Sequence, residues 1–144
     1  MTAAHFAVGL AAARLAGNDW RVALPVAVLS HPVLDLLAGY HPRNVLKADT
    51  LGKQLLIVGW LVTATVALCG IGKPGWLVSC GYGLLAWLWA DGWWGIRYLW
   101  PCLDRYNPHR LWWVRGWEHR EELWGLWLEI ILTVTALVVA INWR

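Results

Sequence analysis

Long apolar stretches separated by short polar segments dominate the pattern along this chain. Turn-forming residues divide the stretches: Gly17-Asn18-Asp19 follows the first, and Gly72-Lys73-Pro74-Gly75 separates the third from the fourth. Each later stretch has roughly the 20 residues that a membrane crossing needs, whereas the first is short and is expected to insert only partly. The pattern predicts helices over about residues 3–16, 20–38, 53–70, 76–100 and 122–143.

Composition sharpens this prediction. Of the 144 residues 59% are hydrophobic and only 15% are charged, with a mean hydropathy of +0.47. Such a chain has too little polar surface to cover a water-soluble globule. No internal repeat or linker divides it. We therefore expect an all-α fold, a polytopic membrane bundle of four to five helices, with residues 1–144 forming a single integral membrane domain.

Charge and aromatic residues predict how the bundle sits in the membrane. The net charge is +3, but the basic residues lie mainly between apolar segments, which indicates contact with lipid headgroups and not with nucleic acid. By the positive-inside bias the two long loops and the N-terminus are cytoplasmic and the C-terminus is outside. The 14 tryptophans fit anchoring at the membrane interface. The basic residues expected on the outer side are Arg14, Arg21, Lys73 and Arg144.

Two ionisable residues, His31 and Asp35, lie inside the apolar run of residues 20–40. Such groups are costly in a membrane span and indicate function by default, although a histidine there can also simply hydrogen-bond a neighbouring helix. At a spacing of four residues the imidazole and the carboxylate share one helix face and can reach the same metal ion. The pair therefore predicts a metal site.

Other polar residues are expected at the same depth. His5 and His31 each lie about 13 residues from the turn at Asn18, so a helical hairpin brings them to the same height. Counting along the later helices places Asp91 and Glu129 in the same layer, on the cytoplasmic half of the membrane. Asp91 has an alternative role as a structural partner of a nearby arginine.

The first 45 residues carry a resemblance. His5-Phe6-Ala7-Val8-Gly9, Ser30-His31-Pro32-Val33-Leu34-Asp35 and His41-Pro42 together resemble the small bacterial inner-membrane proteins of the YdjM-like metal-dependent hydrolase group. That group is similar in its His/Asp pattern to zinc-dependent phospholipases C. The resemblance implies that His5, His31 and Asp35 bind metal and that His41 participates. The P-D-x-D and H-R-G-x-x-H-S segments of longer members do not occur here.

Imidazole and carboxylate ligands suit zinc or another borderline divalent ion. Such a metal lowers the pKa of bound water and so provides a nucleophile near neutral pH, with Asp91 or Glu129 as general base or as ligand of a second metal. We expect a hydrolase that acts on a phosphoester or acyl bond at a lipid headgroup, with membrane lipids as its partners. Two alternatives are a small ion- or proton-coupled transport protein and a non-enzymatic membrane adaptor with a structural metal.

Overall fold

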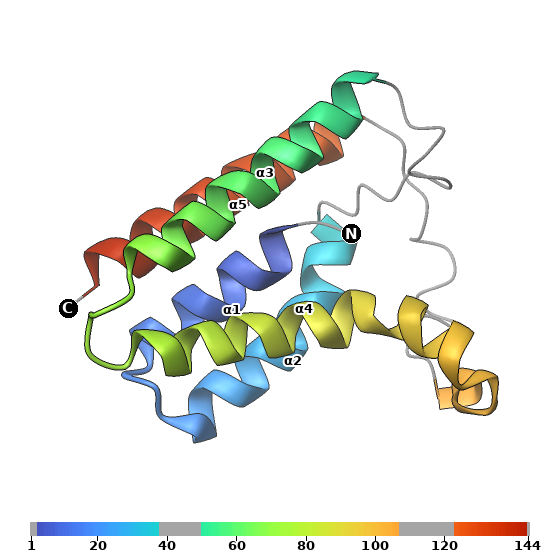
Figure 1. Ribbon diagram of the computed structural model, residues 1–144, viewed down its shortest axis with the longest axis horizontal. Helices are drawn as coiled ribbons and strands as arrows, with labels where there is room; N and C mark the ends of the chain where they lie inside the picture. The colour runs from blue at the N-terminus through green and yellow to red at the C-terminus, as the bar shows by residue number, and fades with distance from the viewer. Residues whose placement is uncertain (1–2, 38–49, 107–122, 144) are drawn as a thin grey trace.

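The computed structural model describes residues 3–37, 50–106 and 123–143, and this part of the chain forms helices joined by turns, with no strand, which confirms the all-α prediction. The helix limits agree with the sequence pattern to within three residues, the largest difference being the start of the third helix at Thr50. A short 3-10 helix after the fourth helix was not predicted. The elements are α1 (Ala3–Leu15), α2 (Trp20–Leu37), α3 (Thr50–Cys69), α4 (Trp76–Leu99), η1 (Pro101–Tyr106) and α5 (Leu123–Asn142) (Figure 1).

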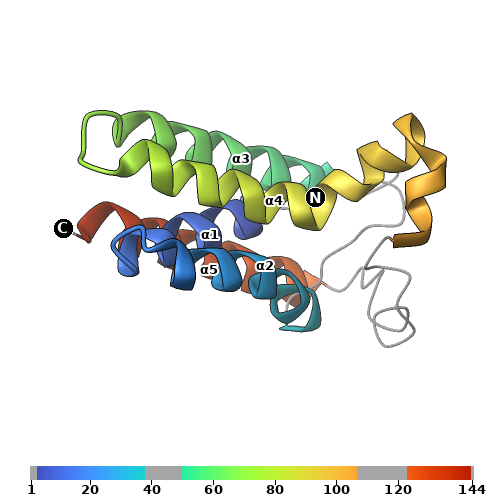
Figure 2. The ribbon, with the colours of Figure 1, turned by 90° about the horizontal axis from the view of Figure 1, so that it is seen from below.

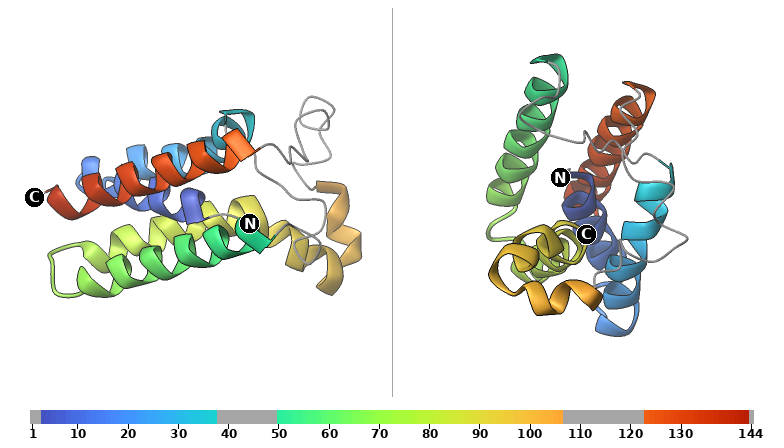
Figure 3. Two further views of the ribbon diagram at one scale, coloured as in Figure 1. Left: turned by 90° about the horizontal axis from the view of Figure 1, so that it is seen from above. Right: turned by 90° about the vertical axis from the view of Figure 1, so that its right-hand side faces the viewer.

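The shortest helix, α1, lies at the centre of the bundle. It packs against α2, α4 and α5, and the start of α1 touches α3. Figure 3 shows α1 between α2, α4 and α5, with α3 further out. Most of its residues are buried, including Ala7, Leu10 and Ala13. The expectation that this segment inserts only partly gave no indication of its central position.

Small residues allow α1 to approach α4 closely. A Cβ atom on Gly9 would lie 2.7 Å from the Cβ of Ala86 and 2.9 Å from the main-chain oxygen of Tyr82, so only glycine fits there. Burial across the described residues shows the same preference for small side chains, because most of the buried apolar residues are alanine. Close backbone contact through small residues is the usual way in which helices pack when lipid surrounds them.

Three segments that are distant in sequence meet at one end of the bundle. The α1–α2 turn, the α3–α4 turn and the end of α5 lie together there, at the left of Figure 1 and Figure 2. Gly17 and Asn18 reverse the chain after α1 with positive φ angles of 60° and 62°. Glycine and asparagine are the residues that adopt this left-handed conformation most easily, so they end the helix here.

Large apolar side chains lie mainly on the outside of the bundle. Leu68 and Leu77 are 66% and 70% exposed, and valine, isoleucine and leucine residues on every long helix share this position. The interior instead holds alanine together with polar residues such as Thr63 and Ser79. Within the described residues, no helical stretch combines the length and the apolar character that a membrane crossing requires.

Candidate functional site

Two of the residues singled out in the sequence, His5 and Glu129, are buried in the bundle. His5 is 2% exposed on α1 and Glu129 is 6% exposed on α5, and these two helices pack directly against each other. One turn after Glu129, the hydroxyl of Thr133 donates a hydrogen bond to the main-chain oxygen of Glu129 (2.7 Å). Ionisable side chains are rarely buried to this extent without a specific role.

The depth of His5 follows from the length of α1. With 13 residues α1 is roughly 20 Å long, whereas α3 and α5, with 20 residues each, are roughly 30 Å long. Because α1 finishes at the same end of the bundle as α3 and α5, it begins inside the bundle. His5 therefore lies well below the surface, near the positive end of a helix, where a carboxylate such as that of Glu129 is electrostatically favoured.

Glu129 lies somewhat deeper than His5 when both are measured from the shared end. Arg14 of α1 contacts Trp143, which follows α5. His5 lies nine residues before Arg14, and Glu129 lies fourteen residues before Trp143. At 1.5 Å per residue these are roughly 13 Å and 21 Å. By this count Glu129 lies roughly one to two helical turns beyond His5, near the start of α1.

The remaining predicted site residues lie on neighbouring helices or outside the described part. His31 and Asp35 belong to α2 and Asp91 to α4, and both helices pack against α1. Their side chains lie outside the described residues, as does the whole of His41. The five candidates His5, His31, Asp35, Asp91 and Glu129 therefore lie on α1 or on helices that pack directly against it. Among the described residues, no three histidine, cysteine, aspartate or glutamate side chains form a group that could hold a metal.

The donor set on these helices fits a borderline divalent ion. His5 supplies imidazole nitrogen and Glu129 carboxylate oxygen, which are both zinc ligand types. Cys69, Cys80 and Cys102 are free and do not cluster with them in the described part of the chain. The other two predicted ligands, His31 and Asp35, lie on α2, which packs against α1.

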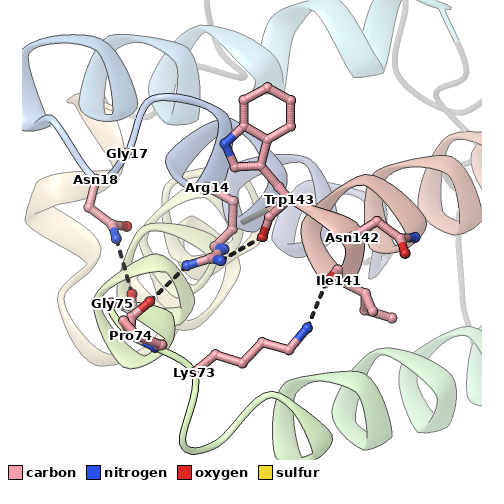
Figure 4. Close-up of a pocket in the computed structure, with 9 residues that line it drawn as sticks. All are labelled: Arg14, Gly17, Asn18, Lys73, Pro74, Gly75, Ile141, Asn142 and Trp143. Carbon is pink, nitrogen blue, oxygen red and sulfur yellow. Dashed lines mark hydrogen bonds between the residues drawn. The ribbon is translucent and has the colours of Figure 1, made fainter.

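A second polar site, which we call the basic pocket, lies at the opposite end, where the three segments meet. It has a volume of about 830 Å³, and Figure 4 shows its side chains converging from α1, the α3–α4 turn and the end of α5. Two cations, Arg14 and Lys73, are among the nine lining residues, and none of the nine is acidic. The others are Gly17, Asn18, Pro74, Gly75, Ile141, Asn142 and Trp143.

Both cations bind main-chain oxygens. Arg14 donates to the oxygens of Pro74 (2.8 Å) and Trp143 (2.7 Å), and Lys73 donates to the oxygen of Ile141 (2.6 Å). The last carbonyls of a helix have no partner within the helix and carry partial negative charge, so cations stabilise this end of α5. The two residues thereby tie α5 to α1 and to the α3–α4 turn.

Trp76 forms the floor beneath both cations. Its ring centroid is 5.7 Å from the Arg14 guanidinium carbon and 5.8 Å from the Lys73 nitrogen, distances at which the electron-rich ring attracts a cation. The indole N–H donates to the oxygen of Ala67 (2.8 Å). A Cβ atom at Gly70 would overlap the ring, so this glycine makes room for it.

Sequence reasoning placed Arg14 and Lys73 on one side of the membrane but did not recognise that they form a site. The available signal was their position: Arg14 lies in the last turn of its helix and Lys73 in a four-residue connection on the same side. Nothing in the sequence indicates that both bind the end of α5, because these contacts span 129 and 68 residues.

No known protein family, curated protein or solved structure matches this chain.

Proposed function

We propose that this chain is an integral protein of the bacterial inner membrane that holds a divalent metal, zinc or a similar ion, in its interior and hydrolyses lipid substrates. The observation that carries the proposal is the burial of His5 and Glu129 on two helices that pack together. An ionisable side chain in the interior of so apolar a chain is by default a candidate for a functional site.

The distribution of side chains supports the membrane part of the proposal. Leucine, isoleucine and valine cover the outside of every long helix, while alanine, glycine, serine and threonine fill the contacts between helices. Contiguous apolar surface of this extent is not tolerated in water, but it is what a lipid environment requires. Serine and threonine hydroxyls here bond to carbonyls of their own helices, as for Ser30 and Thr65, so they cost little in an apolar environment.

The hydrolase part rests on the donor set and on the resemblance of the first 45 residues to YdjM-like metal-dependent hydrolases. His5, His31 and Asp35 are the metal ligands in this proposal. A zinc ion held there supplies Lewis acidity and an activated water. Asp91 or Glu129 would accept the proton of the water that attacks the ester, and that proton would pass to the leaving alcohol when the ester bond breaks. His41 participates in this proposal as the resemblance implies. Depth in the bilayer favours a lipid ester over a soluble metabolite as substrate.

The test of this activity uses the detergent-purified chain with added zinc and two lipid substrates, a phosphodiester lipid and a carboxylic ester lipid, each followed by release of the headgroup or fatty acid. We expect release from one of them that falls at least about a hundredfold in His5→Ala. Arg21→Gln is the matched control and should retain the rate, because Arg21 is an exposed cation at the other end of the bundle that does not line the basic pocket. Equal rates in the wild type and in His5→Ala would refute a hydrolase that works through this centre.

A further inference from the structure

The basic pocket has more hydrogen-bond donors than it uses. Arg14 employs two of its five N–H groups and Lys73 one of its three. The Arg14 Nε atom is buried and donates to no acceptor in the described part of the chain. Asn18 adds a further N–H, since its amide gives one hydrogen bond to the oxygen of Gly75 (3.2 Å). Unused donors beside two cations form a site that suits an anion.

The charge of the pocket is only partly compensated. The main-chain oxygens of Pro74, Ile141 and Trp143 carry partial negative charge, but no lining residue is acidic. Arg14 is held rigidly, being 8% exposed and fixed at two oxygens, while Lys73 is exposed and points across the opening (Figure 4). A buried guanidinium with an exposed ammonium at the rim is a suitable arrangement for a phosphate group.

The rim indicates where that phosphate comes from. Ile141 and Trp143 line the pocket and are both exposed, and Val138, one turn earlier on α5, is 52% exposed. Ile71, in the turn that carries Lys73, is exposed as well. An apolar surface that runs from the pocket along α5 matches a ligand with a charged head and acyl chains. Tryptophan at such a boundary is typical of the headgroup level.

We propose that the basic pocket binds the phosphate group of an anionic membrane lipid. This inference rests on the membrane placement in the proposed function but not on the metal centre. The lipid headgroup contacts Lys73 and the outer edge of Arg14, and its acyl chains lie along the apolar face of α5. The bound lipid thereby links α1, the α3–α4 turn and the end of α5 at the membrane surface.

Native mass spectrometry of the detergent-solubilised chain tests the proposal. The chain is titrated with phosphatidylglycerol and, separately, with phosphatidylcholine of the same acyl chains. We expect at least a tenfold preference for phosphatidylglycerol. Lys73→Gln should weaken the binding of phosphatidylglycerol by about tenfold, close to the effect of losing one charge-assisted hydrogen bond. Lys73→Arg should retain the affinity for phosphatidylglycerol. Arg21→Gln is the matched control, because Arg21 is an exposed cation at the same end that does not line the pocket.

Three results would overturn the inference. The first is equal affinity for the two lipids, and the second is the same loss in Lys73→Gln and Arg21→Gln, which would mean diffuse attraction. The third is displacement of phosphatidylglycerol by millimolar inorganic phosphate, which would make the pocket a site for free phosphate. Metal content measured on the same Lys73→Gln sample separates this inference from the metal centre, because it should equal that of the wild type. A chain that stays in solution without detergent would refute the membrane placement itself.

Discussion

Arg14 donates a hydrogen bond of 2.7 Å to the main-chain oxygen of Trp143, across 129 residues of sequence. The contact joins the last turn of the central helix to the end of the last one. Because Arg14 also donates to Pro74, a single side chain holds three segments of the bundle together. The burial of this arginine at a helix end is therefore explained by main-chain carbonyl groups that need donors.

Replacement of Arg14 should destabilise the bundle. Arg14→Met keeps most of the apolar stem but removes both hydrogen bonds and the contact with Trp76, and we expect a loss of about 3 kcal/mol in the free energy of unfolding. Thermal or denaturant unfolding of the detergent-solubilised chain, followed by circular dichroism, measures this loss. Arg21→Met, on an exposed position at the same end, should leave stability unchanged. Similar stabilities of both variants would contradict the role assigned to Arg14.

A methyl group at Gly9 should force α1 away from α4. Its Cβ would lie 2.7 Å from that of Ala86, which is closer than side-chain atoms approach each other, so Gly9→Ala is expected to cost about 1–3 kcal/mol. Gly81 is a helical glycine with open space around its Cβ position. Gly81→Ala should therefore stabilise the chain by up to about 1 kcal/mol through helix propensity. The same unfolding measurement compares them, and the close contact is refuted if both substitutions act in the same direction.

The outer faces of the helices should be in contact with lipid. A spin label at Val134, on the exposed face in the middle of α5, is expected to collide often with oxygen and rarely with a water-soluble nickel complex. A label at Lys73, at the end of the bundle, should show the reverse. The experiment uses the chain in lipid vesicles, with the native thiols of Cys69, Cys80 and Cys102 replaced by alanine. High accessibility of the Val134 label to nickel would contradict the membrane placement.

The sequence predicted the helices well because apolar runs and turn residues are local signals. Gly17-Asn18-Asp19 and Gly72-Lys73-Pro74-Gly75 end or separate helices by their own backbone preferences, and the structure turns at both places. The burial of Glu129 could also be anticipated, since it is the one ionisable residue in the last apolar run.

Packing between helices could not be predicted in the same way. The centrality of α1 depends on Gly9 fitting against Ala86, and nothing in a short alanine-rich segment says which partner it will meet. The pairing of Arg14 and Lys73 with the end of α5 is likewise a tertiary contact. Hydropathy assigned both cations to one side of the membrane, but hydrogen-bond partners so far apart in sequence leave no local pattern.

Metal content is the measurement that tests the central claim most directly. Elemental analysis of the chain, purified in detergent without chelator, should find about one equivalent of zinc or a similar divalent ion. We expect that metal to be lost in His5→Ala, His31→Ala and Asp35→Ala, each checked for a monodisperse folded state, and retained in the control Lys73→Gln. A metal-free wild type, or equal metal in the wild type and all three ligand variants, would contradict a metal centre built on these helices.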